Sequence, residues 1–157
     1  MPPKQNGLTG VRATFLEELS IASRKLRTLF DARVRAMGLT LARARTLMHL
    51  ARKEGMTQTE LAEILEVEGP TLVRLLDGLA AQGLIERRPV EGDRRAKQIA
   101  LTAEGQQLAA KVTRLANDVR EEVLADIPEA DLVTAAAAMR AIVQKISILA
   151  DCETDAA

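Results

Sequence analysis

The sequence contains no tryptophan and no tyrosine, and its 157 residues include only two aromatic ones, Phe15 and Phe30. Aliphatic residues must therefore build the core, which favours helix-on-helix packing. The single cysteine, Cys152, excludes an internal disulfide framework and agrees with a reducing cytosol. The single histidine, His49, falls off the apolar face of its predicted helix and has no second histidine with which to share a metal. We therefore expect an ordinary surface histidine and no metal site.

Catalytic groups and long hydrophobic runs are also scarce. With one histidine, one cysteine, no tyrosine and no glycine-rich phosphate loop, no catalytic constellation stands out, so we expect neither an enzyme nor a cofactor. The first ten residues lack the apolar core of a signal peptide. The longest apolar run, near VTAAAAMRAIV, is interrupted by Arg140 well short of a membrane span. These absences predict a soluble, cytoplasmic protein without a membrane partner.

The formal net charge is zero, but the charges are unevenly placed. Residues 1–45 carry nine Lys or Arg against three Asp or Glu, and residues 98–157 carry five against ten. Such a balance neither requires nor excludes nucleic acid, because the position of the cations decides the matter. Five cations fall within residues 87–97, and these are Arg87, Arg88, Arg94, Arg95 and Lys97.

Apolar spacing predicts a mostly helical chain. A long helix is expected over 10–37 and a second over 40–53, both with apolar residues on one face. Thr57 and Glu60 have the spacing of a capping box, which starts a short helix. Pro70 is expected as the first residue of the next helix, which ends at Gly83. Two further helices are expected, after Thr102 and after Pro128.

Two short strands are predicted between these helices, at 84–89 and 97–102, with 90–95 as the connecting loop. Two short helices followed by a charged hairpin indicate a winged helix-turn-helix in a mostly α (α+β) fold. We divide the compact domain into a tail and dimerisation helix (1–38), a DNA-binding region (39–101) and C-terminal dimerisation helices (102–157). The apolar stripes of the long terminal helices favour a homodimer.

The helix that begins at Pro70 is the predicted recognition helix. Thr71 and Arg74 lie one turn apart on the face opposite the leucines, where an arginine can bind guanine O6 and N7. The free N–H groups at the start of the helix can also face phosphate. The alternative is a capping Thr71 and an Arg74 that pairs with Asp77, although an exposed ion pair contributes under about 1 kcal/mol. Groove reading by Pro70, Thr71 and Arg74 is favoured.

The hairpin tip is the predicted wing, with Asp93, Arg94, Arg95 and Lys97 as its contact residues. Asp93 stands two residues before Arg95, close enough to orient its guanidinium. Arginines here can enter a narrow minor groove, where the negative potential is strongest. The alternative is a solvated charged loop. Thr57 and Arg87 are additional candidates for phosphate contacts.

The block from 56 to 105, which includes PTLVRLLDGL, GLIER and DRRAK, resembles the MarR family of bacterial winged-helix regulators, and its SlyA branch in particular. The flanks resemble it through helix lengths and through Arg24, Arg27, Asp31 and Arg33. The resemblance implies a dimer built from the first and the last two helices, which binds a pseudo-palindromic operator in double-stranded DNA. It also implies recognition contacts and a D-x-R wing signature, at Pro70, Thr71, Arg74, Asp93 and Arg95.

Many members of that family release DNA when a small phenolic anion binds between the dimer and DNA-reading regions. SlyA-like relatives carry tryptophan at the positions of Leu26 and Ala44, which are aliphatic here. Arg24 and Arg27 are the candidates to bind the carboxylate of a small aromatic effector. The alternative is that both are solvated charges on a dimer helix.

Two functions follow from these observations. The first is a homodimeric transcription regulator in which phosphate contacts supply affinity and Thr71 and Arg74 choose the base sequence. The alternative is a winged-helix module that binds a protein, since a fold does not fix a function. The acidic C-terminal third would then face a basic partner.

Overall fold

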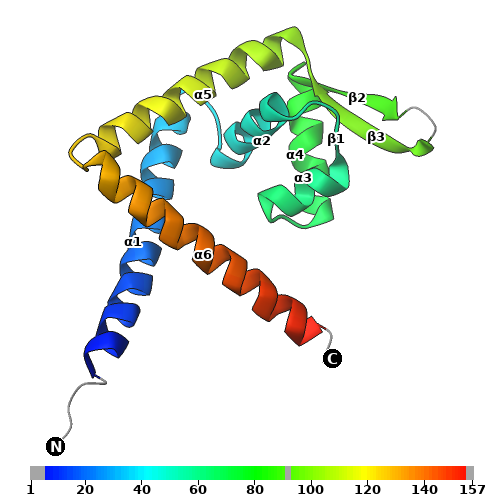
Figure 1. Cartoon of the computed structure of the whole chain (residues 1–157). Helices are drawn as coiled ribbons and strands as arrows, with labels where there is room; N and C mark the ends of the chain where they lie inside the picture. The colour runs from blue at the N-terminus through cyan, green and yellow to red at the C-terminus, as the bar shows by residue number, and fades with distance from the viewer. Residues whose placement is uncertain (1–5, 91–92, 155–157) are drawn as a thin grey trace, which may run out of the picture. The chain divides into compact units, whose positions relative to one another are not determined.

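The computed structural model describes the backbone of residues 6–90 and 93–154 and the side chains of residues 10–89 and 97–152. The elements are α1 (Asn6–Ala36), α2 (Leu41–Arg52), β1 (Met56–Thr57), α3 (Gln58–Leu65), α4 (Gly69–Ala81), β2 (Ile85–Val90), β3 (Asp93–Leu101), α5 (Ala103–Leu124) and α6 (Glu129–Thr154) (Figure 1). This order confirms the predicted mostly helical winged helix. The chain divides into two compact units, 1–119 and 120–157, with the boundary inside α5. The three functional regions drawn from the sequence do not coincide with these units and stay a prediction.

The core of the first unit lies among α2, α3, α4, the sheet and the start of α5. Leucines at helical spacing on three helices meet there, and burying each contributes about 1.5–3 kcal/mol. The fully or nearly buried members are Leu47, Leu50, Met56, Leu61, Leu65, Leu72, Leu76, Leu79, Ile85, Ile99 and Ala109. A second cluster, of Val34, Leu39, Ala44 and Val112, joins the end of α1 to α2 and α5.

Three antiparallel strands form one sheet in the order β1-β3-β2. The β2–β3 hairpin extends beyond α2, α3 and α4 (Figure 1). The prediction of a loop over 90–95 is wrong, because Val90 pairs with Asp93 and β3 already begins there. Pairing to β2 extends the strand through a charged stretch that has no apolar alternation. Residues 91 and 92 lie outside the described residues.

The strand β1 was not predicted from the sequence. It consists of Met56 and Thr57, which pair with Ile99 and Gln98 of β3. Two residues are too short for any periodicity, so the strand is defined only by its partner. It brings the start of α3 against the wing.

Most predicted helix ends agree with the structure, although α1 begins at Asn6 rather than at residue 10. Gly83 follows α4 with a positive φ of 69°, a conformation that glycine adopts without steric cost. Thr57 and Glu60 form the predicted capping box of α3. Pro70, however, is the second helical residue, because α4 begins at Gly69. Its missing N–H costs no helical bond in the first turn.

The start of α5 lies directly against the backbone at the base of the wing. The Thr102 hydroxyl donates to the Gly83 carbonyl at 2.6 Å and accepts from the Gly105 N–H at 3.1 Å. The Thr102 N–H donates to the Leu84 carbonyl at 3.1 Å. Gly105 is buried, and a Cβ there would lie 1.9 Å from the Leu84 oxygen. Only a residue without a side chain fits at this contact.

The long terminal helices carry exposed apolar side chains. On α1 these include Val11, Phe15, Leu16 and Leu26, and on α6 Val133, Val143, Ile146, Ile148 and Leu149. Within α6, the 24-residue stretch Glu129–Cys152 contains an 18-residue window with a mean hydropathy of 1.5, so length and composition alone would allow a membrane span. The uninterrupted apolar run is still broken by Arg140, as predicted, although the whole helix is long and apolar enough to span a membrane. Arg140 nevertheless lies near the middle of this stretch, and inserting an arginine at the centre of a bilayer costs about 2.5–3.5 kcal/mol.

Candidate nucleic-acid interface

One face of α4 is free of core contacts. Leu72, Leu76 and Leu79 are buried on the inner side, whereas Pro70, Thr71 and Arg74 are exposed. The N-cap residue is Glu68, which makes no side-chain cap, so Thr71 is not the capping residue that the alternative interpretation required. The exposed carboxylates of Glu66 and Glu68 precede the helix and oppose an anion at its N-terminus. The exposed side chains of Thr71 and Arg74, rather than the helix end, are therefore the better candidates for DNA contact.

An ion pair connects α4 to the wing. Arg87 Nη2 of β2 lies 2.6 Å from Asp77 Oδ1 of α4. The alternative pairing of Asp77 with Arg74 is not formed, because the carboxylate binds Arg87 instead. The Arg87 side chain is 29% exposed and directed at Asp77, so its proposed phosphate contact would need this pair to open. Sequence reasoning missed this contact because ten residues separate the partners.

The wing cations lie on both strands of the hairpin. Arg88 of β2 pairs with Glu86, its Nε donating to Glu86 Oε1 at 2.7 Å. Lys97 is exposed on β3, opposite Pro89. Asp93, Arg94 and Arg95 belong to β3, but their side chains lie outside the described residues, so their predicted contacts stay predictions.

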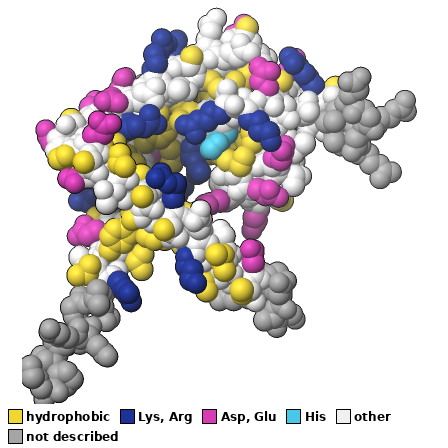
Figure 2. Space-filling model, in the orientation of Figure 1, with side chains coloured by type: hydrophobic (Ala, Val, Ile, Leu, Met, Phe, Trp, Pro, Cys, Tyr) yellow, Lys and Arg dark blue, Asp and Glu magenta, His cyan; other side chains and the backbone are white. Residues whose placement is uncertain are grey.

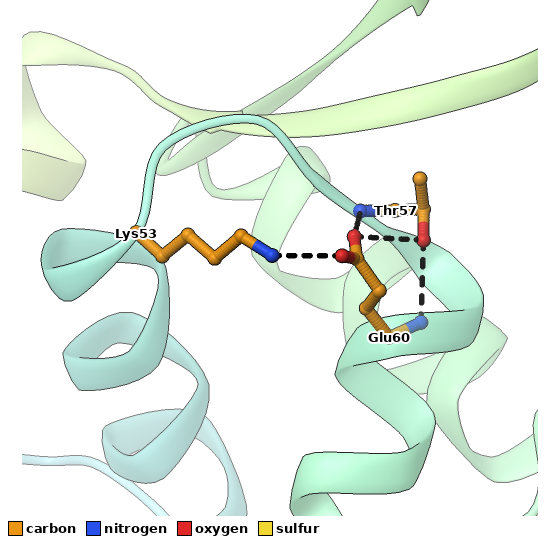
Figure 3. Close-up of polar contacts among 3 residues, drawn as sticks. All are labelled: Lys53, Thr57 and Glu60. Atoms are coloured by element: carbon orange, nitrogen blue, oxygen red, sulfur yellow. Dashed lines mark hydrogen bonds and ion pairs between the residues drawn. The ribbon is translucent and has the colours of Figure 1, made fainter.

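The Thr57 hydroxyl already forms hydrogen bonds inside the protein. It accepts from the Glu60 N–H at 3.2 Å and donates to Glu60 Oε2 at 3.0 Å, and the Thr57 N–H donates to the same oxygen at 2.7 Å (Figure 3). Lys53 Nζ reaches the other carboxylate oxygen, Glu60 Oε1, at 2.8 Å. The hydrogen bond from Lys53, followed by those from Thr57, lowers the pKa of Glu60 to about 2. A phosphate contact at Thr57 would compete with this network.

His49 lies among cations on α2. Figure 2 shows its side chain with Lys or Arg side chains close by. Burial lowers the pKa of His49, and the charges of Arg45 and Arg52 lower it further. The residue is half-buried, and part of its side chain lies at the surface (Figure 2). Among the described residues no cluster of metal-binding side chains occurs.

A cleft of about 410 Å³ lies between α1, α2 and α4. Its charged lining residues are Arg27, Asp31, Arg45 and Glu66. Asp31 pairs with Arg35 at 2.9 Å. The cleft includes one of the two predicted effector residues, Arg27, whereas Arg24 is exposed on α1 and does not line it. Of the two positions that hold tryptophan in SlyA-like relatives, Leu26 is exposed and Ala44 is buried in the core.

Known proteins with the same fold are found among the MarR-family regulators. The sequence pattern of the MarR family matches residues 37–96. The crystal structure of transcriptional regulator PA3341 is 42% identical, covering 85% of this chain and 98% of that chain with a TM-score of 0.78. The chain belongs to the MarR family.

More distant MarR-type structures share the fold. The Staphylococcus aureus MepR–DNA complex is 23% identical over 83% of this chain and 97% of that chain, with a TM-score of 0.73. A putative MarR family regulator from Listeria monocytogenes, complexed with 26mer DNA, is 21% identical over 83% of this chain and 87% of that chain, with a TM-score of 0.74. MarR-family proteins are transcription regulators and not enzymes, so the prediction of a non-enzyme is confirmed.

Proposed function

We propose that this MarR-family protein is a sequence-specific transcription regulator that binds a pseudo-palindromic DNA operator as a homodimer. The observation that carries the proposal is the exposed face of α4, where Arg74 is available because Asp77 is bound to Arg87. Arg74 can then bind a guanine edge in the major groove while Thr71 contacts a neighbouring base. The related PA3341 is itself called a transcriptional regulator, which supports this assignment.

The homodimer is supported by the exposed apolar residues of α1 and α6, which a second copy would cover. A two-fold axis would place the two α4 helices in successive major grooves, about 10 base pairs apart. Such a dimer is cytoplasmic and needs no membrane, since the apolar stripe of α6 then faces protein. Within the family, the motif GLIER and the wing sequence DRRAK favour the SlyA branch.

The wing supplies phosphate and minor-groove contacts through Arg94, Arg95 and Lys97, with Asp93 orienting Arg95. Thr57 and Arg87 are secondary phosphate candidates because both already have partners inside the protein. The two DNA complexes formed by MepR and by the Listeria regulator support DNA as the partner of this fold.

The effector is a small aromatic carboxylate bound in the cleft between α1, α2 and α4. Arg27 lines that cleft together with Arg45, and either guanidinium can pair with a carboxylate. Arg24 lies outside the lining and is the weaker of the two candidates.

Fluorescence anisotropy of the protein with its own upstream DNA and with a random duplex, at two salt concentrations, tests the proposal. We expect nanomolar affinity for upstream DNA that falls steeply as salt increases, because phosphate contacts release counterions. If the upstream DNA carries no operator, selection from a random duplex pool identifies one. Failure to select any salt-sensitive sequence would support the protein-binding alternative, in which Arg74 is dispensable.

A further inference from the structure

One position on the proposed groove-facing side of α4 is occupied by a glycine and therefore has no side chain. Positions 71, 74 and 78 lie at i, i+3 and i+7 and share one face of the helix. The first two hold Thr71 and Arg74, but the third is Gly78. Glycine inside a helix lowers its stability, so its presence there calls for a packing reason.

The space beside Gly78 is filled from another helix. Arg43 of α2 brings its Nη2 to 3.0 Å from the point where a Cβ of residue 78 would lie. The guanidinium thus occupies the place of the missing side chain, one turn beyond Arg74. An alanine at this position would push the guanidinium aside by a few tenths of an ångström.

Arg43 is also unfavourably placed for its own helix. It is the third residue of α2, and its N–H donates to the N-cap Thr40 at 3.3 Å. In a capping box this third position holds a glutamate, as Glu60 does in α3. The helix dipole disfavours a cation in the first turn, and α2 has no acidic residue there. A local conflict of this kind points to a role outside the helix.

Within the described side chains, the Arg43 guanidinium has no carboxylate partner. Asp77, the acidic residue of α4, is bound to Arg87 of β2. Arg43 is half-buried, and its guanidinium lies beside Gly78 of α4. A fixed, unneutralised guanidinium beside a groove-reading helix suits an anion supplied by the DNA.

We propose that Arg43 is a DNA-contacting residue, which reaches across Gly78 to bind a backbone phosphate beside the groove that Arg74 reads. The proposal rests on the proposed DNA-binding function. A phosphate contact adds affinity without sequence choice, so Arg43 strengthens binding to every duplex whereas Arg74 selects among them.

The experiment measures binding of the full-length protein to a selected operator and to a random duplex across a series of KCl concentrations. Arg43→Gln should weaken binding to both duplexes by at least about tenfold at low salt. It should also lower the slope of log K against log[KCl] by about 0.9 per lost contact, or about 1.8 for a dimer. Arg43→Lys should keep most of the slope, and Arg52→Gln, an exposed arginine of the same helix, serves as the matched control.

Circular dichroism and thermal unfolding establish that each variant folds. Should Arg43→Gln fail to fold, Arg43→Met keeps the stem beside Gly78 and removes only the charge. An unchanged salt slope in the folded Arg43→Gln or Arg43→Met protein would overturn the proposal while leaving the DNA-binding function intact. Salt-independent or absent binding by the unmodified protein would overturn both.

Discussion

Replacing Gly105 with alanine tests the packing of α5 against the base of the wing. The added Cβ would lie 1.9 Å from the Leu84 oxygen, about 1.5 Å short of the 3.4 Å at which ordinary contact begins. Overpacking of this kind costs about 1–3 kcal/mol, and displacing the Leu84 carbonyl also weakens its bond from Thr102 by about 1 kcal/mol. Against this, the better helix propensity of alanine stabilises α5 by about 1 kcal/mol. We therefore expect Gly105→Ala to lower the free energy of unfolding by about 1–3 kcal/mol.

The assay is urea unfolding followed by circular dichroism at a fixed protein concentration, since a dimer makes stability concentration-dependent. Gly78→Ala is the matched control, because among the described side chains its Cβ would meet only the flexible end of Arg43. That control should be neutral or more stable by up to about 1 kcal/mol. Equal stability of Gly105→Ala and Gly78→Ala would refute the close contact between α5 and Leu84.

The remaining predictions concern the capping box and the bridge between α4 and the wing. Thr57→Ala should lower the free energy of unfolding by about 0.5–2 kcal/mol in the same assay, and an unchanged value would show that α3 does not need its cap. Because the folded pKa of Glu60 is about 2, its stabilising charge is fully present above about pH 4.5 and is lost as the pH falls toward 2. Glu60→Gln should therefore flatten the acid side of the stability curve, and an identical curve would contradict the role of its charge. Asp77→Asn and Arg87→Gln should each weaken operator binding. The double variant should lose less binding free energy than the two single variants lose together. Additive losses would mean that the pair does not position the wing.

Much of the fold could be predicted from the sequence because its signals are local. Gly83, the capping box at Thr57 and the leucine spacing of α4 each act within a few residues and define helix ends and faces. The hairpin was also predicted, although its strands extend further than the apolar alternation indicates.

The contacts that organise the candidate interface could not be predicted in the same way. Asp77 meets Arg87, and Arg43 meets Gly78, only after α2, α4 and the wing have packed. The sequence suggested Arg74 as the partner of Asp77 because the two are three residues apart, yet in the folded protein the carboxylate binds Arg87 of the hairpin. Likewise, β1 exists only through its pairing with β3.

The central claim is that α4 reads DNA sequence through Arg74. The most direct test compares the unmodified protein with Arg74→Ala on the selected operator, on single-base-pair variants of each half-site and on a random duplex. We expect Arg74→Ala to lose about 1–3 kcal/mol of binding free energy on the operator, to discriminate less at one base pair per half-site and to bind the random duplex almost unchanged. Equal losses on all three kinds of duplex would contradict base reading by Arg74 and reduce it to a phosphate contact.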